Sequence, residues 1–262
     1  MKHFKILLSA LVILSAVGIY LPLQAQDGIT IHQYRQVAPE HMQEFIERET
    51  TYWSKVAEHA ATKGNLTFWA LLVKQGGFDL PNSPNVLFIN TYNDIDNMGG
   101  TWNPSEVFPD VPVEKMETMS MSKVMHTVYL RTAHWVEKEG VVPSDDFNYV
   151  VMVYHDTDSP GQLIALENEH WAPFIKSAMD AGKTPQKAWG NSVILSPSGP
   201  DMKATTLSYD LYSSLKDALA PNWTDDASFP EEGLAKINEL ENGRRISYVY
   251  RIVQVVNPNA DN

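Results

Sequence analysis

The chain has 262 residues, of which 20 are Lys or Arg and 32 are Asp or Glu, so its formal net charge is −12. This excess of negative charge argues against nucleic acid and anionic membranes as partners, because both would repel the chain. The chain contains no Cys, which excludes disulfides and a thiol nucleophile, so burial of apolar surface must stabilise the fold.

The first 25 residues have the pattern of a secretory signal peptide. Lys2 and Lys5 flank the start of an almost unbroken apolar run that reaches residue 20, and Ala25 is a small residue suited to cleavage. The run is shorter than the roughly 20 residues of a membrane-spanning helix. We therefore expect an exported chain, periplasmic or extracellular, with no stable membrane insertion after cleavage. An uncleaved membrane anchor is the alternative.

The next segments predict a strand, a helix, two strands, short helical pieces and a final strand. Apolar and polar residues alternate over residues 29–37, which indicates a strand. Pro39 begins a helix whose apolar residues recur at helical spacing, and Gly64 ends it. Aromatic and β-branched residues indicate strands over 66–74, 86–92 and 123–136. Glycines and prolines break residues 94–119 into short helical pieces.

The same order of elements then recurs. The second series is expected as strands over 147–155, 186–195, 204–211 and 245–256, with helices over 160–181, 213–219 and 231–240. We therefore divide the chain into a signal peptide over 1–25, a first unit over 26–137, a linker over 138–146 and a second unit over 147–262.

Individual positions repeat as well. Glu49, Trp53 and Gly64 match Glu167, Trp171 and Gly182 at an offset of 118 residues. Trp69 matches Trp189 at an offset of 120, and Trp102 matches Trp223 at an offset of 121. Such self-similarity predicts a duplicated architecture.

Each series has the strand–helix–strand–strand–helix–strand order of a ferredoxin-like unit. One unit leaves an apolar sheet face bare, and two units can cover these faces by packing their sheets together. On this element order and these duplicated positions, residues 29–256 resemble the dimeric α+β-barrel superfamily in a fused tandem form. The resemblance implies an α+β fold of two tandem ferredoxin-like (βαββαβ) repeats, packed sheet to sheet as an intrachain α+β barrel.

The resemblance also implies a ligand cleft between the sheet and the helices of a unit. Members of the superfamily include cofactor-independent monooxygenases, muconolactone isomerase-like enzymes, and haem-degrading or haem-binding proteins. The scaffold therefore does not select one activity.

Two glutamates are the first candidates for catalysis. Glu49 precedes Trp53 by four residues, and Glu167 precedes Trp171 by four, so each carboxylate lies one helical turn from an indole. A carboxylate beside an indole in an apolar cleft would have a raised pKa, as a general base or acid needs. The alternatives are a solvated Glu at the edge of the apolar stripe and a structural pair with an arginine.

Arg131 and Arg251 lie near the middle of the last strand of each unit. Either could bind a carboxylate or enolate bidentately in the cleft, or form a structural ion pair with Glu49 or Glu167. The sequence leaves both interpretations open.

His170 has the spacing from Glu167 at which two helical side chains could share a metal ion. This pair supplies only two ligands, and Tyr52 holds the matching place in the first unit, so no metal site is predicted. A solvated helix residue is the simpler interpretation of His170. A proton shuttle or haem ligand in the second cleft is the alternative.

The repeated tryptophans fall into two classes. Trp69 and Trp189 lie in strands and are expected in the core. Trp102 and Trp223 lie in loops, where they could cap the mouth of a cleft and stack on a flat ligand.

These features predict an exported protein that binds a small apolar or aromatic ligand in one or both clefts, with no cofactor required and haem as the alternative. The first cleft would be lined by Glu49, Trp53 and Arg131, and the second by Glu167, His170, Trp171 and Arg251. A cofactor-independent monooxygenase or isomerase, with Glu or His as base and Arg stabilising an enolate, is the rival. A structural envelope protein without a ligand is the third interpretation. The sequence has no nucleophile elbow, phosphate loop or dinucleotide-binding glycine motif, which argues against hydrolases and nucleotide-binding proteins.

Overall fold

A computed structural model describes residues 28–77, 82–198, 204–243 and 245–257. The predicted signal peptide over residues 1–25 lies outside the described residues. The strands form one closed barrel in which neighbouring strands are antiparallel. In chain order they are β1 (Ile29–Val37), β2 (Leu66–Lys74), β3 (Val86–Tyr92), β4 (Ser122–Glu137), β5 (Tyr149–His155), β6 (Ala188–Ser196), β7 (Thr206–Tyr212) and β8 (Ile246–Val256).

The strand order around the barrel is β1-β3-β2-β8-β5-β7-β6-β4. The first four strands therefore lie in the order β4-β1-β3-β2, and the last four in the matching order β8-β5-β7-β6. The pairs β2–β8 and β4–β6 join the two halves and close the ring. The prediction of an α+β barrel formed within a single chain is confirmed.

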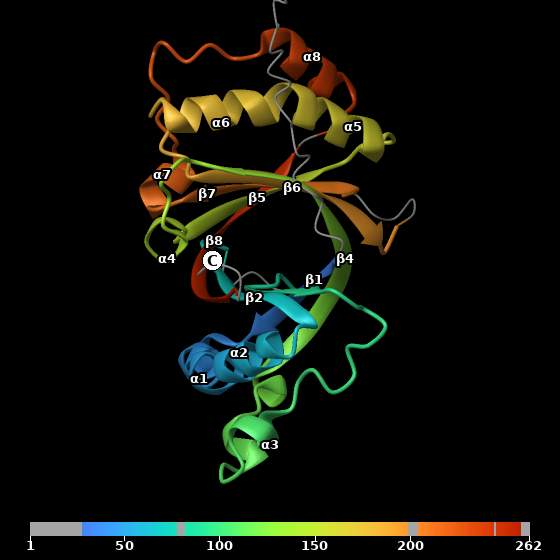
Figure 1. Ribbon diagram of the computed structural model, residues 1–262, viewed down its shortest axis with the longest axis vertical. Helices are drawn as coiled ribbons and strands as arrows, with labels where there is room; N and C mark the ends of the chain where they lie inside the picture. The colour runs from blue at the N-terminus through green and yellow to red at the C-terminus, as the bar shows by residue number, and fades with distance from the viewer. Residues whose placement is uncertain (1–27, 78–81, 199–203, 244, 258–262) are drawn as a thin grey trace, which may run out of the picture.

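Helices cover the outside of the barrel on two opposite sides (Figure 1). One side carries α1 (Met42–Arg48), the π-helical turn η2 (Glu49–Trp53) and α2 (Ser54–Thr62). The other carries α5 (Pro160–Leu166), the π-helical turn η5 (Glu167–Trp171), α6 (Ala172–Asp180) and α8 (Glu231–Glu239). The shorter helices are α3 (Pro104–Val107), α4 (Pro143–Asp146) and α7 (Leu215–Leu219), with 3-10 turns η1 (Pro39–His41), η3 (Val113–Lys115) and η4 (Met119–Met121).

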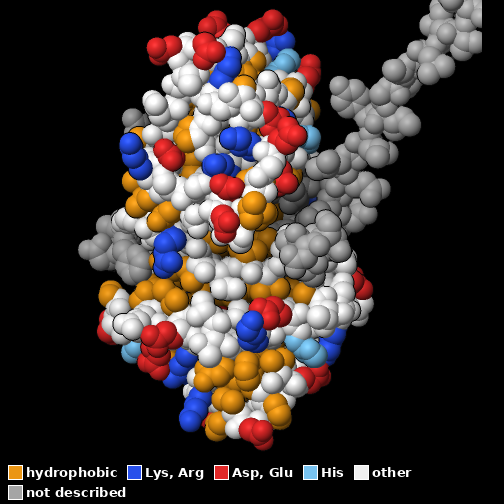
Figure 2. Space-filling model, turned by 60° about the vertical axis from the view of Figure 1, so that its left-hand side comes forward, with side chains coloured by type: hydrophobic (Ala, Val, Ile, Leu, Met, Phe, Trp, Pro, Cys, Tyr) orange, Lys and Arg blue, Asp and Glu red, His pale blue; other side chains and the backbone are white. Residues whose placement is uncertain are grey.

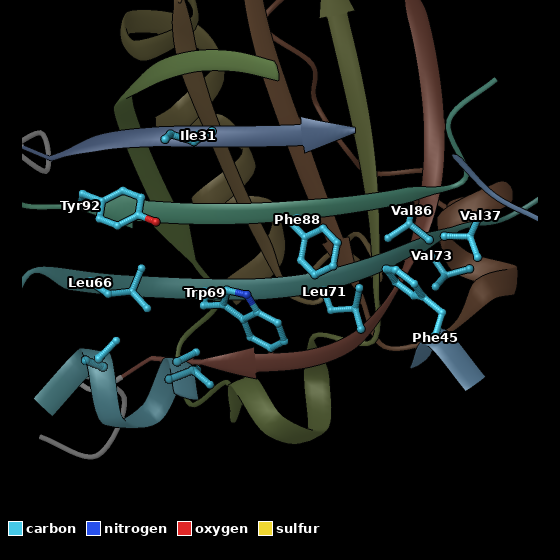
Figure 3. Close-up of a cluster of buried hydrophobic side chains, with 14 of the residues drawn as sticks. Ile31, Val37, Phe45, Leu66, Trp69, Leu71, Val73, Val86, Phe88 and Tyr92 are labelled. Carbon is cyan, nitrogen blue, oxygen red and sulfur yellow. The ribbon is translucent and has the colours of Figure 1, made fainter. Parts of the chain in front are cut away.

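The apolar side chains form three clusters, separated by the sheet. The first lies between the first-half strands and α1–α2, where Phe45, Trp69 and Phe88 meet (Figure 3). The second fills the barrel interior with side chains from all eight strands, from Tyr34 on β1 to Tyr250 on β8. The third lies between α6 and the second-half strands. Because strand side chains alternate between faces, the outer clusters and the interior are distinct compartments.

The predicted elements match the observed ones closely. The strands over 29–37, 66–74 and 86–92 have the predicted bounds. The long helices end where predicted, because Gly64 and Gly182 have φ values of +86° and +69°, a left-handed conformation that glycine adopts without strain. The predicted linker contains the one-turn helix α4.

Basic and acidic side chains are interspersed on the face that Figure 2 shows. Within the described part of the chain, no helix is both long and apolar enough to span a bilayer.

Candidate functional site

Glu49 and Glu167 are buried at matching places in the two halves. Their residues are 4% and 5% exposed, and each begins a π-helical turn, η2 or η5, inside a long helix. A π turn inserts an extra residue into an α-helix, and such insertions are frequent at functional sites. The prediction that these carboxylates point inward agrees with their burial, and the alternative of solvated side chains is wrong.

In the first half, Glu49 has one direct hydrogen-bond partner among the described side chains. Thr118 Oγ1 donates to Glu49 Oε1 over 2.6 Å, and Thr118 is itself buried. Burial raises the pKa of Glu49 to about 7, against the opposing effects of the Thr118 hydrogen bond and the Arg35 charge. A carboxyl with such a pKa can both accept and release a proton near neutral pH.

Arg35 on β1 supplies the positive charge beside Glu49. Its Nε donates to Gln33 Oε1 over 2.6 Å, its Nη1 donates to Ser122 Oγ over 3.4 Å, and its guanidinium carbon lies 4.8 Å from the centroid of the Phe88 ring. Burial lowers the pKa of Arg35, and the charge of Glu49 opposes this shift. Within the described residues Arg35 forms no direct ion pair, so its charge remains available to an anion.

A cavity of about 510 Å³ borders this cluster. Its lining includes Val37, Asn85 and Ser122, and Ser122 also accepts the hydrogen bond from Arg35. Pockets of about 300–1,000 Å³ are typical of small-molecule sites. Neither Glu49 nor Arg35 lines the cavity, so a small ligand bound in it would meet this cluster through Ser122.

In the second half, Glu167 lies against strand residues. Asn191 Nδ2 donates to Glu167 Oε2 over 2.9 Å, and His155 Nε2 lies 3.8 Å from Glu167 Oε1. Burial raises the pKa of Glu167, and the neighbouring His155 and the Asn191 hydrogen bond oppose the shift.

His155 links Glu167 to a larger polar cluster. His155 Nδ1 lies 2.6 Å from Glu241 Oε1, and His155 Nε2 lies 2.8 Å from Ser208 Oγ. Asn191 Oδ1 and Thr206 Oγ1 are buried without a hydrogen-bond partner in the described structure. His155 therefore bridges Glu241 and Ser208 by its two ring nitrogens, and Glu167 lies next to this bridge without a direct hydrogen bond to it.

His170 does not join this cluster, and its catalytic role stays a prediction. Its side chain packs against Gly233 of α8, where an added Cβ atom would lie 2.5 Å from His170 Cβ. Its Nε2 lies 3.8 Å from a carboxylate oxygen of the exposed Glu169. The helix turns His170 toward α8, where its side chain is half-buried. Among the described residues, no group of three or more acidic or imidazole side chains is placed to hold a metal ion.

Arg131 and Arg251 are exposed, on β4 and β8. The structure brings neither of them to Glu49 or Glu167, whose basic neighbours are Arg35 and His155 instead. The structural ion pairs considered from the sequence are therefore wrong. A role for Arg131 and Arg251 in ligand binding stays a prediction.

The loop tryptophans pack against the helix tryptophans of their own half. The ring centroids of Trp53 and Trp102 are 6.4 Å apart, and those of Trp171 and Trp223 are 6.5 Å apart. Trp53 Nε1 donates to the Met116 carbonyl, and Trp102 Nε1 donates to the Tyr92 hydroxyl. All four are half-buried, so stacking on a ligand stays a prediction. Trp69 and Trp189 are each 2% exposed, as expected for core residues.

Sequence reasoning missed Arg35 and His155. Tyr34-Arg35 and Tyr154-His155 are offset by 120 residues, the same offset as Trp69 and Trp189. Aligning the first strands of the two units at that offset places Arg35 and His155 at one position.

No protein-family model matches the chain, and no curated protein sequence matches it. Solved structures share its fold. An anthrone oxidase-like protein aligns with a TM-score of 0.55 and 16% identity, over 89% of this chain and 94% of that chain. A candidate monooxygenase from Lactobacillus acidophilus NCFM aligns with a TM-score of 0.52 and 8% identity, over 88% and 95% of the two chains.

A haem-binding protein from Thermus thermophilus aligns with a TM-score of 0.46 and 10% identity, over 86% and 90% of the two chains. That likeness is too loose to carry an argument about haem. The first two similarities show the fold alone. The chain has a mixed α+β fold with a closed eight-stranded antiparallel barrel, and its structural neighbours are anthrone oxidase-like and monooxygenase-type α+β-barrel proteins.

Proposed function

We propose that this protein is an enzyme that removes a proton from a small enolisable or phenolic aromatic substrate, with Glu49 as the base. The observation that carries the proposal is the burial of Glu49, which raises its pKa to about 7, beside an arginine that makes no ion pair among the described residues. A base is most effective when its pKa lies near the working pH.

The proposed step breaks one C–H or O–H bond of the substrate. The proton moves to the Glu49 carboxylate, and the electron pair stays on the substrate as an enolate or phenolate. Arg35 stabilises that anion, because a fixed cation in a poorly solvated site interacts strongly with developing charge. The anion then reacts with dioxygen in a monooxygenase or oxidase, or is reprotonated at another atom in an isomerase.

The names of the two similar structures, an anthrone oxidase-like protein and a monooxygenase, support dioxygen as the second reactant. Anthrone is accordingly the first substrate to test. Dioxygen consumption and the product spectrum should be followed with the wild type, with Glu49→Gln and with Glu58→Gln. Glu58 lies on the same long helix, is exposed and pairs with Lys55, so it is a matched control.

We expect Glu49→Gln to lower turnover at least about a hundredfold, because general-base catalysis contributes roughly 10²–10⁴-fold, and Glu58→Gln to leave it unchanged. Equal turnover in Glu49→Gln and the wild type would exclude Glu49 as the base. Arg35→Met should lower turnover and weaken the binding of substrate anions.

Ligand binding without turnover is the second candidate function. The cavity beside Ser122 and the half-buried Trp53–Trp102 pair favour it. Saturable quenching of tryptophan fluorescence by anthrone, with no product and no dioxygen uptake, would select this candidate.

We also propose that a ferredoxin-like unit was duplicated in tandem to form the barrel, and that the chain is exported. The matching strand order of the halves and the matching π turns at Glu49 and Glu167 support the duplication. The signal-like pattern of residues 1–25 supports export. Mass spectrometry of the chain recovered from an expressing host tests the cleavage after Ala25.

A further inference from the structure

A second cavity, of about 480 Å³, lies at one end of the barrel. Its lining comes from the ends of β1, β2 and β5 and from the beginnings of β4 and β8, including Tyr34, Tyr154 and Tyr248. Tyr34 belongs to the cluster that fills the barrel, whereas its neighbour Arg35 contacts Phe88 of the outer cluster. The sheet therefore separates this cavity from the site at Glu49.

Lys74 places a buried positive charge in the lining of this cavity. The residue is 4% exposed, and its Nζ donates to the neutral Ser83 Oγ over 2.5 Å and lies 5.4 Å from the centroid of the Tyr248 ring. Across the described ranges, no carboxylate lies within ion-pairing distance of Lys74. Burial lowers its pKa. A buried ammonium without a counter-ion is unfavourable, and an anionic ligand would compensate it.

Aromatic side chains make up much of the remaining lining, which also includes the carboxylate of Asp156. The hydroxyls of Tyr34 and Tyr154 are 2.6 Å apart, and the Tyr34 ring stacks on the His126 ring with centroids 4.3 Å apart. Tyr154 and Tyr248 meet edge to face, with centroids 6.0 Å apart. Burial raises the pKa values of Tyr34 and Tyr154, so these phenols stay neutral and can donate hydrogen bonds. Aromatic walls of this kind favour stacked or edge-to-face contact with another ring.

We infer that the barrel end is a second ligand site that binds a planar aromatic carboxylate, with the carboxylate on Lys74 and the ring against the tyrosines. The cavity volume lies in the range of small-molecule sites. This site is independent of the deprotonation proposed at Glu49, since the two lie on opposite faces of the sheet.

Titration calorimetry with 2-naphthoate and its neutral analogue 2-naphthamide tests the inference on the full chain. We expect 2-naphthoate to bind the wild type at one site, and at least tenfold more tightly than 2-naphthamide. Lys74→Met should weaken 2-naphthoate binding at least tenfold and remove the preference for the anion. Lys216→Met, which changes an exposed lysine on α7, is the matched control and should bind like the wild type.

Thermal unfolding of Lys74→Met shows whether the variant is folded, and a methionine in place of an uncompensated buried ammonium should not destabilise it. Glu49→Gln should bind 2-naphthoate like the wild type. The inference is overturned by the absence of saturable binding at millimolar 2-naphthoate, or by equal affinity for the acid and the amide. Unchanged binding in Lys74→Met together with lost binding in Glu49→Gln would also overturn it, and would assign the ligand to the outer cleft.

Discussion

Arg35 and His155 hold the same place in the two halves, 120 residues apart near the ends of β1 and β5, and each lies beside the buried glutamate of its own half. The side chains that lie beside the two glutamates differ in chemistry. An arginine side chain only donates hydrogen bonds, whereas an imidazole has two distinct ring nitrogens. The first half therefore presents a base beside a fixed cation, and the second half presents a carboxylate beside an imidazole. We infer that the two outer sites do not perform the same reaction.

The stability of the protein should depend on the ionisation of Glu49. Its pKa is raised to about 7 in the folded state, so the folded chain holds this proton more tightly than the unfolded chain does. The resulting stabilisation is present at pH values below about 4.5 and is lost as the pH rises through the folded-state pKa, by about 3 kcal/mol at most.

Glu49→Gln lacks this ionisation. The difference in free energy of unfolding, variant minus wild type, should therefore become more positive between pH 5 and pH 8. Urea unfolding at a series of pH values measures the difference. Burial also raises the pKa values of Glu167 and Asp210, but both groups are retained in the variant and cancel in the comparison. A difference that does not change with pH would show that Glu49 titrates normally.

Thr118→Val should raise the pKa of Glu49 further. The Thr118 hydroxyl donates to the Glu49 carboxylate, and this hydrogen bond favours the ionised form. Valine has the same shape and cannot donate, so the pH midpoint of any Glu49-dependent activity should move upward. An unchanged midpoint in the pH–rate profile would show that the hydrogen bond does not control the base.

His155→Gln should destabilise the second half by roughly 1–3 kcal/mol, because it disrupts the buried hydrogen bonds to Ser208 and Glu241, although Glu241 keeps its ion pair with Arg245. His59→Gln is the matched control, since His59 pairs with Glu106 at an exposed position. Exposed pairs contribute little, so its effect should stay within about 0.5 kcal/mol. Similar losses of unfolding free energy in the two variants would contradict the importance of the buried cluster.

Gly190→Ala should be strongly destabilising. A Cβ atom at Gly190 of β6 would lie 2.4 Å from Tyr209 Cε2 and 2.9 Å from the His134 carbonyl oxygen, which the packed barrel cannot accommodate without shifting. We expect a loss of roughly 2–4 kcal/mol. Gly161→Ala in α5 meets nothing within 4 Å and should be neutral or stabilising by up to about 1 kcal/mol. Denaturant unfolding of both variants measures the contrast, and equal effects would contradict the packing at Gly190.

The element order could be predicted because the apolar periodicity and the glycine and proline positions are local signals. The strand over 29–37 and the helix end at Gly64 follow from neighbouring residues alone. The burial of Glu49 could be suspected from its place near the apolar stripe. Its π turn could not, because the extra residue depends on how the whole helix packs on the sheet.

The partners of the two carboxylates were harder to predict, because they come from residues far away in the chain. Arg131 is a plausible partner by its apolar neighbours, yet Val128 and Leu130 fill the barrel interior and Arg131 is exposed. His170 lies three residues from Glu167 but faces α8 instead of the sheet. His155 was overlooked because its importance depends on Glu241, 86 residues away.

The ionisation of Glu49 is the most direct test of the proposed function. The Cδ chemical shift of ¹³C-labelled glutamates can be followed by NMR from pH 4 to pH 9, with the Glu49 signal assigned as the one missing from Glu49→Gln. The proposal predicts a midpoint near the folded-state pKa of about 7. A midpoint below about 5, the range of ordinary glutamates, would contradict a buried base at this position.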